Sequence, residues 1–220
     1  MNALRITTCL AANTDEFTIG LAESLSDALA RPVTVVNDLD WPARYAQIGQ
    51  GAIQLAWICG WPYVNLFQPT NVVMPIAGAC FRGDCYAGQP VYFSVVVVVR
   101  ADSHVGQMTD LRGSRFAVNE PGSLSGYHVM RGYLAEQAWG SGFFGRIHVS
   151  GGHVASLQQL LTGEVDAAAI DSTVYTWWRR TQPHDAPRVR VLETLGPHPV
   201  PPWVIHRSVS PELGRAVRSA

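Results

Sequence analysis

Lysine is absent from this chain of 220 residues, and all sixteen basic residues are arginine. Without a lysine amine the protein has no residue for Schiff-base chemistry, and it also lacks the lysine of a phosphate-binding P-loop. Charged residues make up only 15% of the chain, and the formal net charge is -1. No global field therefore attracts nucleic acid or an anionic membrane, so any recognition of charge must be local.

Long hydrophobic runs are also missing. The longest apolar run, around Val95 to Val99, is too short to cross a bilayer and predicts a buried strand. The sequence enters a strand almost at once and shows no basic leader followed by an apolar segment. We therefore expect either a cytoplasmic protein or one whose export segment is absent from this sequence.

The chain has only four cysteines, too few for a disulfide framework at this length. Cys9 and Cys59 end apolar strands, and we expect buried thiols there. Cys80 and Cys85 bracket a tight loop that can carry one bridge in an oxidising compartment, and the sequence leaves their redox state open. Because no second ligand pair accompanies them, no metal site is expected.

Strand and helix patterns alternate along the whole chain, which predicts an α/β fold with mostly parallel sheets. The predicted strands are Leu4–Cys9, Val33–Val36, Ile53–Ile58, Val72–Ala77, Tyr92–Arg100, Arg115–Val118, Arg146–Val149, Val165–Ile170, Val189–Leu195 and Trp203–His206. The predicted helices are Asp15–Leu29, Pro42–Gln50, Pro62–Phe67, Tyr127–Ala138, Val154–Leu161, Ser172–Arg180 and a short one from Pro211.

An internal echo indicates two similar lobes. Gln47 to Ile58 and Gln159 to Ile170 each read as the end of a helix, a glycine and a buried strand. We expect residues 1–95 and 193–220 to form lobe one and residues 96–192 to form lobe two. Segments 92–100 and 189–195 then cross between the lobes as a hinge, and a cleft between hinged lobes is a ligand site.

The segment from Asn119 to Gly126 is the most informative part of the chain. It follows a short apolar strand and leads into a helical pattern, so two hydroxyls and several free N–H groups meet at a helix N-terminus. That geometry binds oxyanions. The alternative is an ordinary N-cap with a turn glycine.

Six motifs in order resemble the phosphate/phosphonate substrate-binding components of ABC transporters. They are Tyr92-Phe-Ser94, Val99-Arg-Ala-Asp-Ser103, Asp110-Leu-Arg-Gly113, Pro121-Gly-Ser-Leu-Ser-Gly126, Gly151-Gly-His153 and Gly163-Glu-Val-Asp-Ala-Ala-Ala-Ile-Asp171. The resemblance covers nearly the whole chain and implies the two-lobed type II periplasmic-binding-protein fold with an interlobe cleft.

The resemblance also implies roles for single residues. Ser123 and Ser125, with the N–H groups of Ser125 and Gly126, would hold the phosphonate oxygens, and His153 would donate to the same group. Tyr92 would reach across from the hinge strand, and Asp171 would face a cationic or hydroxyl group of the ligand. Each residue also has a structural explanation: His153 and Asp171 as helix caps or solvated residues, and Tyr92 as strand packing.

Two departures concern the ligand. The family usually has a hydroxyl residue between the two serines, where this chain has Leu124, so one contact is lost and the pocket is less polar. Gln54 stands where an acidic residue is common. Aromatic residues gather near predicted strand ends and favour a cationic or ring-bearing ligand; Trp57 and Tyr63 are the preferred lobe-one contacts. The chain also ends early for this family, after the short helix from Pro211.

The function implied is non-catalytic: a monomeric solute-binding protein for a small anionic ligand, serving an ABC permease or a sensor, without cofactor or metal. A periplasmic location follows from the resemblance if a leader was removed. The serines lack the Gly-x-Ser-x-Gly context of an activated nucleophile. The alternative is an enzyme on the same fold, in which His153 or Asp171 acts as acid or base on an aromatic or carboxylate substrate.

Overall fold

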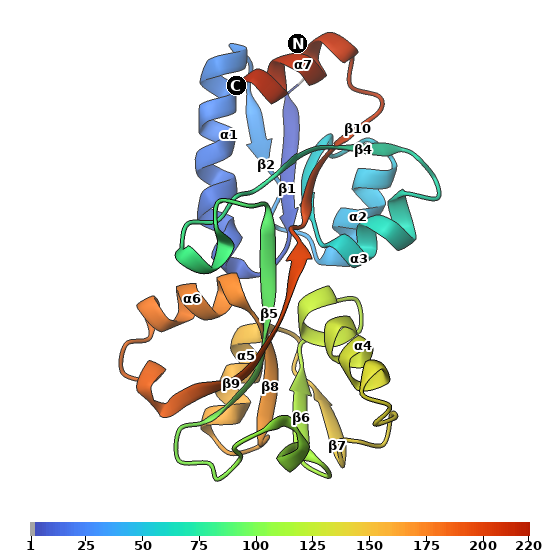
Figure 1. Ribbon diagram of the computed structural model, residues 1–220. Helices are drawn as coiled ribbons and strands as arrows, with labels where there is room; N and C mark the ends of the chain where they lie inside the picture. The colour runs from blue at the N-terminus through green and yellow to red at the C-terminus, as the bar shows by residue number, and fades with distance from the viewer. Residues whose placement is uncertain (1–2) are drawn as a thin grey trace. The chain divides into compact units, whose positions relative to one another are not determined.

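The computed structural model describes residues 3–220, apart from the side chains of Asp84 and Val95–Val98, and divides the chain into two compact units (Figure 1). The first unit is formed by the chain up to Cys80 and by Val200–Ala220, and the second by Phe81–Pro199. The sequence predicts lobe boundaries near residues 95 and 193. The segments at these boundaries are β5 (Val91–Arg100) and β9 (Val189–Pro199), which pair with each other along their length inside the second unit.

The first unit is built on a five-stranded sheet with the order β2-β1-β3-β10-β4. The strands are β1 (Leu4–Cys9), β2 (Val33–Val35), β3 (Leu55–Ile58), β4 (Val73–Gly78) and β10 (Pro202–His206). β1 pairs in parallel with β2 and β3, whereas β10 runs antiparallel to both β3 and β4. The returning segment of the chain is therefore inserted as one reversed strand.

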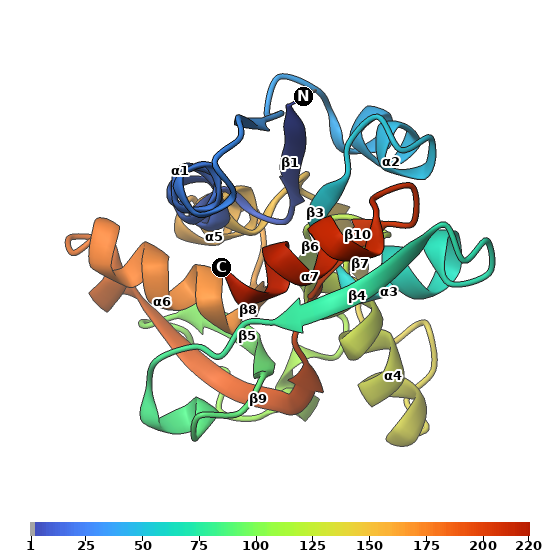
Figure 2. The ribbon, with the colours of Figure 1, turned by 90° about the horizontal axis from the view of Figure 1, so that it is seen from above.

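Helices lie on both sides of this sheet: Figure 2 shows α1 and α2 on opposite sides of β1 and β3. The helices are α1 (Asp15–Leu29), α2 (Trp41–Gly49), the short α3 (Gly60–Pro62) with the π-helical turn η2 (Tyr63–Phe67), and α7 (Pro211–Ser219). A buried cluster that includes Ile48, Ile58 and Phe67 joins α2 and η2 to the strands. This apolar contact, rather than helix propensity, holds such short helices in place.

Arg44 of α2 is a buried cation that ties several chain segments together. Its side chain is only 9% exposed and donates to three backbone carbonyls: Nε to Leu39 at 2.7 Å, NH1 to Thr8 at 2.6 Å and NH2 to Asn37 at 2.7 Å. Burial raises the pKa of the nearby Cys9 thiol to about 12, although the charge of Arg44 acts in the opposite direction. Cys9 is therefore an inert, buried thiol, as its place at the end of an apolar strand predicts.

The other cysteines are also free thiols. Cys59 is half-buried rather than buried, because it follows the carboxyl end of the central strand β3, while Cys80 and Cys85 are exposed.

The second unit repeats the architecture with the strand order β7-β6-β8-β5-β9. Its other strands are β6 (Arg115–Val118), β7 (Arg146–Val149) and β8 (Ala167–Asp171). β6 pairs in parallel with β7 and β8, while β5 runs antiparallel to β8 and β9. Each unit thus has one reversed strand in fourth place, so each sheet is more mixed than the mostly parallel sheets that the sequence predicts.

The helices of the second unit surround a core rich in aromatic residues. They are the π-helical turn η5 (Leu124–His128), which runs directly into α4 (Val129–Glu136), and also α5 (His153–Leu161) and α6 (Ser172–Thr181). Phe116 of β6 stacks on Phe144 with ring centroids 4.1 Å apart, and both belong to the buried cluster. Within the part of the chain that the structure describes, no helix combines the length and apolar character of a membrane span.

The echo in the sequence corresponds to the same helix ending in both units. The N–H groups of Ala52 and Ile53 both donate to the carbonyl of Gln47, and those of Glu164 and Val165 both donate to the carbonyl of Gln159. Gly51 and Gly163, with φ of 73° and 76°, adopt the left-handed conformation that this ending requires. Because the cap uses these N–H groups, each following strand begins two residues later than its apolar pattern predicts.

We expect replacement of Arg44 by methionine to destabilise the first unit by about 2–5 kcal/mol, because three backbone carbonyls lose their donor at once. Urea denaturation followed by tryptophan fluorescence measures this loss. Arg215→Ala in α7 is the matched control, since Arg215 is exposed, and its effect should stay within about 0.5 kcal/mol. An Arg44→Met variant as stable as the parent would contradict the assigned role.

Candidate functional site: the serine loop of the second unit

The serine loop, residues 119–126, connects β6 to the helix formed by η5 and α4. Ser123 has extended backbone angles, and its Oγ accepts a hydrogen bond from the Gly126 N–H at 3.1 Å. The His128 N–H reaches the Ser123 carbonyl at 3.1 Å, so the first turn is wide and spans five residues. Ser123 is therefore an N-cap, as the local sequence pattern predicts, but on a π-helical turn, a form that often occurs at functional sites.

This start of the helix leaves backbone donors uncommitted. Among the described residues, the N–H groups of Leu124 and Ser125 have no hydrogen-bond acceptor, whereas the Gly126 N–H already donates to Ser123 Oγ. The expected donor set of the loop thus shifts by one residue, from Ser125 and Gly126 to Leu124 and Ser125. The aligned peptide dipoles make this end of the helix favourable for a negative charge.

A buried polar cluster lies directly against the loop. Nε2 of His153, the first residue of α5, is 3.4 Å from Ser125 Oγ and 3.3 Å from Asn119 Nδ2. His153, Ser125 and Asn119 are at most 5% exposed. A Cβ at Gly126 would overlap the side-chain oxygen of Asn119 and lie 2.9 Å from Cε1 of His153. Only glycine therefore allows the helix to approach these side chains so closely.

Ser94 fixes the other side of Ser125. This serine of β5 is fully buried, and its hydroxyl donates to the backbone carbonyl of Ser125 at 2.6 Å. The start of the helix is thus held from β5 and from α5 at the same time. Such a doubly anchored backbone keeps its free N–H groups in place before any ligand arrives.

The electrostatics of the cluster favour neutral groups. Burial lowers the pKa of His153, and the negative charge of Asp171 and the carbonyl of Ala169 oppose this shift only in part. Burial also raises the pKa of Glu120, at the beginning of the loop. The loop therefore presents neutral donors and a helix N-terminus rather than a paired arginine.

Asp171 ends β8 and caps α6. Its Oδ1 accepts from the Thr173 N–H at 2.8 Å and from the Thr173 hydroxyl at 2.7 Å. This is the helix-capping arrangement that the sequence left open as an alternative. Oδ2 of Asp171 makes no hydrogen bond among the described residues, and the side chain is half-buried. One carboxylate oxygen thus remains for another partner.

Tyr92 of β5 is 2% exposed and packs against His198, with ring centroids 5.8 Å apart. Its neighbour Phe93 is held by Ser172, whose Oγ accepts from the Phe93 N–H at 3.1 Å and from the Tyr86 hydroxyl at 3.2 Å. Tyr92 thus lies in the strand packing of the second unit, and its surface is almost fully covered.

The two residues proposed for lobe one lie in the first unit. Trp57 is 3% exposed; it stacks on Trp203 at 5.1 Å, and its indole N–H donates to the Pro201 carbonyl at 2.9 Å. Tyr63 is half-buried and packs against the core cluster of that unit. Trp57 therefore has the surroundings of a core residue, and Tyr63 keeps an accessible side.

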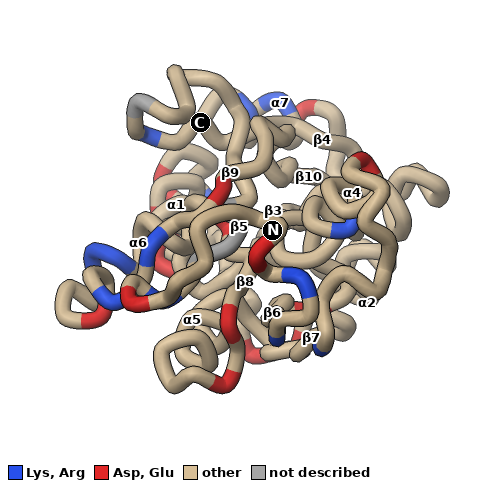
Figure 3. The backbone as a smooth tube through the Cα atoms, turned by 60° about the horizontal axis from the view of Figure 1, so that its bottom comes forward, with Lys and Arg blue, Asp and Glu red and all other residues tan. Residues whose placement is uncertain are grey.

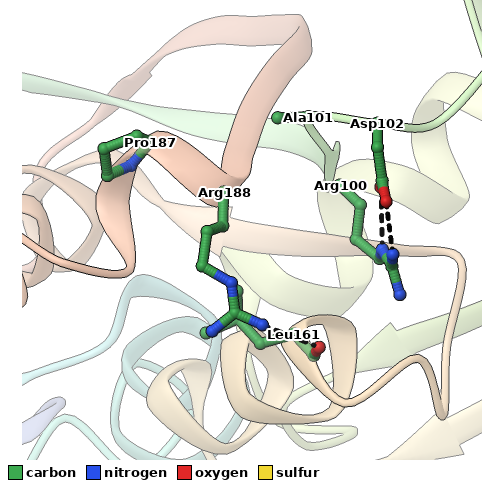
Figure 4. A pocket seen from close by; sticks show the side chains of 6 residues that line it. All are labelled: Arg100, Ala101, Asp102, Leu161, Pro187 and Arg188. Atoms are coloured by element: carbon green, nitrogen blue, oxygen red, sulfur yellow. Dashed lines mark hydrogen bonds and ion pairs between the residues drawn. The ribbon is translucent and has the colours of Figure 1, made fainter.

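A pocket at the other end of β5 has a different character (Figure 4). It measures about 290 Å³ and is lined by Arg100, Ala101, Asp102, Leu161, Pro187 and Arg188. Both guanidinium groups are occupied, Arg100 by Asp102 and Arg188 by Asp185. Since its cations are already neutralised, this pocket has no free charge for an anion. Figure 3 shows acidic and basic residues interspersed over each unit rather than gathered by sign.

The structure brings together Ser123, Ser125, Gly126 and His153, which the sequence predicts to share one site. Sequence reasoning did not select Asn119 or Ser94. Asn119 directly follows the strand that precedes the serines, and Ser94 belongs to the first matched motif. The close glycine was the available signal: a glycine inside a helix start indicates that another group approaches the backbone. Which group approaches depends on long-range contacts that no local pattern contains.

Comparisons with known proteins show the family and the fold of the chain. Residues 10–220 match the family described as ABC transporter, phosphonate, periplasmic substrate-binding protein. Among solved structures, PhnD1 from Prochlorococcus marinus in complex with methylphosphonate is similar with a TM-score of 0.81 at 18% identity, over 99% of this chain and 82% of that one. The binding protein component of an ABC phosphonate transporter from Pseudomonas aeruginosa gives 0.78 at 16% identity, over 99% and 72%.

A more distant likeness confirms the fold class. The arginine-, lysine-, histidine-binding protein ArtJ from Geobacillus stearothermophilus is similar with a TM-score of 0.64 at 16% identity, over 99% of this chain and 87% of that one. The fold is thus the type II periplasmic-binding-protein fold, and the alternative of an enzyme finds no support. This chain belongs to the family of periplasmic substrate-binding proteins of phosphonate ABC transporters, whose members bind a solute and do not catalyse a reaction.

Proposed function

We propose that the serine loop of this protein binds the oxyanion end of a small organic phosphonate or phosphate-like ligand for delivery to an ABC permease. The observation that carries the proposal is the doubly anchored helix start, whose Leu124 and Ser125 N–H groups have no acceptor among the described residues. The membership of the chain in a phosphonate-binding family supports the ligand class.

The chemistry of the loop suits an oxyanion that carries several acceptor oxygens. The N–H groups of Leu124 and Ser125 and the hydroxyls of Ser123 and Ser125 are donors on adjacent residues. Hydrogen bonds to a charged acceptor are about twice as strong as neutral ones, and the helix N-terminus adds a favourable field. Since the donors are neutral, the empty site contains no buried cation without a partner.

We assign to Asp171 the binding of the opposite end of the ligand. Its Oδ1 is used by Thr173, while Oδ2 has no partner among the described residues. A cationic or hydroxyl group on the ligand would pair with this oxygen. Tyr92 completes the proposed contacts in the second unit, and His153 contributes through its contact with Ser125.

The ligand range of similar structures is wide. PhnD1 from Prochlorococcus marinus was solved with methylphosphonate, and XAC2383 from Xanthomonas citri, similar with a TM-score of 0.73 at 14% identity over the whole of this chain and 82% of that one, was solved with ATP. Leu124 in place of the usual hydroxyl residue makes the loop less polar, which favours an organic phosphonate over inorganic phosphate. We further infer a periplasmic location and a monomeric state, which suit delivery of a diffusible ligand.

We expect methylphosphonate to raise the unfolding temperature of the parent protein and Ser125→Ala to weaken its binding by roughly tenfold to a hundredfold, since a hydrogen bond to a charged group contributes about 1.5–3 kcal/mol. Isothermal titration calorimetry gives the affinities. Ser141→Ala, at an exposed serine of the same unit, is the matched control and should bind like the parent. Equal affinity of Ser125→Ala and the parent would place the site elsewhere.

Leu124→Thr restores a hydroxyl between the two serines. We expect it to tighten methylphosphonate binding by about fivefold to tenfold, because one more hydrogen bond of roughly 1 kcal/mol reaches the oxyanion. The same titration measures the gain, and Leu124→Val controls for the change in shape. A threonine variant that binds no better than the valine variant would show that residue 124 points away from the ligand.

Asp171→Asn removes the negative charge while keeping a residue that caps helices well. We expect the parent to prefer an aminoalkylphosphonate over the alkylphosphonate of the same length, because the ammonium group pairs with the carboxylate. The asparagine variant should lose most of this preference while retaining the affinity for the alkylphosphonate. Competition titrations with the two ligands measure the ratio, and an unchanged ratio would remove Asp171 from the ligand contacts.

A further inference from the structure

His153 Nε2 has two competing neighbours in the serine-loop site. Asn119 Nδ2 lies at 3.3 Å and Ser125 Oγ at 3.4 Å from this nitrogen. Burial disfavours the charged imidazolium, so the ring is neutral and has one N–H donor and one nitrogen lone pair. The Asn119 amide and the Ser125 hydroxyl therefore compete to donate to one ring nitrogen. The outcome of this competition determines where the Ser125 proton points.

The orientation of the Asn119 amide follows from its second neighbour. Its Oδ1 lies where a Cβ of Gly126 would stand, which is in line with a Cα–H bond of that glycine. A carbonyl oxygen in this position makes a weak Cα–H···O contact, whereas an amide N–H would meet a C–H bond. The NH₂ group therefore faces His153, and because it can only donate, Nε2 is the acceptor and the ring proton is on Nδ1.

We propose that Asn119 is a positioning residue that directs the Ser125 hydroxyl proton toward the ligand. By donating to His153 Nε2, Asn119 occupies the lone pair that Ser125 would otherwise use. The Ser125 hydroxyl is then a donor to the bound oxyanion. This inference rests on the proposed function of the serine loop. It makes Asn119 the residue that determines which protonation state of the ligand the loop prefers.

Without Asn119, the Ser125 hydroxyl would donate to His153 and present its oxygen lone pairs to the ligand. A fully ionised phosphonate and a sulfonate have only acceptor oxygens on the anionic group, so both would lose a hydrogen bond. A singly protonated phosphonate carries a P–OH group, which would donate to the Ser125 oxygen instead. Asn119 thus selects acceptor-only oxyanions over protonated ones.

Other ionisable groups surround this cluster. Asp171 acts on His153 from β8, Glu120 lies in the loop itself, and His128 follows at the end of η5, with burial as the main cause that lowers its pKa. A change of pH would titrate several of them together. The decisive comparison is therefore made at one pH with two ligands of equal charge, methylphosphonate and methanesulfonate.

The first experiment is a double-mutant cycle with Asn119→Ala and Ser125→Ala, read by calorimetric titration with methylphosphonate at about pH 9, where a phosphate-like group is fully ionised. We expect Asn119→Ala to weaken binding about tenfold in the parent but less than about twofold in the Ser125→Ala background. In the Ser123→Ala background, the control, the full tenfold loss should remain, because within the described residues Ser123 makes no hydrogen bond to His153.

The second experiment compares the two ligands at about pH 5.5, where a phosphate-like group keeps one proton and both ligands carry a single negative charge. Asn119→Ala should weaken methanesulfonate about tenfold and methylphosphonate far less. Thermal unfolding checks that each variant folds, and Asn119→Ser replaces the alanine variant if it does not; the backbone bond from the Gly151 N–H to the Asn119 carbonyl at 2.8 Å is kept in both.

The outcomes separate this inference from the proposed function. An equal loss in all backgrounds and for both ligands would make Asn119 a packing residue and overturn the inference, while leaving the serine loop as the binding site. No loss in any background would overturn it as well. A parent protein that binds neither ligand would refute the proposed function itself.

Discussion

The close approach of the Gly126 backbone to Asn119 and His153 is the constraint on which the site depends. A side chain at position 126 would collide with both residues, so glycine is the condition for bringing the helix start onto the buried cluster. Once there, Ser125 is held by the Ser94 hydroxyl from β5 and contacts His153 from α5. Three elements far apart in the sequence thus fix one short stretch of backbone, and a fixed backbone loses little entropy when it binds a ligand.

The same constraint explains why neutral groups suffice for an anion. The binding energy we propose comes from N–H groups that a helix start leaves without partners, and these groups need no counter-ion when the site is empty. A buried arginine would have required a carboxylate or several carbonyls, as Arg44 shows in the first unit, where three carbonyls surround the guanidinium. Arg100 and Arg188 in the second unit are likewise committed to aspartates. These three arginines thus serve structure, and we propose that the polar backbone of the loop serves recognition.

Local pattern was enough for much of the fold. The strands Arg115–Val118 and Arg146–Val149 begin and end where their apolar residues predict. Errors arose where a hydrogen bond overrides hydrophobicity: Ile53 and Val165 are apolar and precede strands, yet their N–H groups close the preceding helix. β9 continues through Pro197 to Pro199, beyond the predicted end at Leu195, because an edge strand needs no donor on its outer side.

The site was predictable in part for the same physical reason. In the local sequence, Ser123 and Gly126 indicate a capped helix start, and the order of the motifs predicts that His153 lies near it. Asn119 and Ser94 were not selected, since their importance lies in contacts made across the sheet. The pairing of β5 with β9 is likewise a long-range contact that no local pattern contains.

The central claim is that the free N–H groups at the start of η5 bind the oxyanion of the ligand. Two-dimensional ¹H–¹⁵N NMR of the protein titrated with methylphosphonate tests this most directly, because a hydrogen bond to an anion moves an amide proton resonance strongly downfield. The account predicts the largest downfield shifts at the amides of Leu124 and Ser125, with small changes in α1 and α7. Saturable binding that leaves these two amides unmoved while others shift would contradict it.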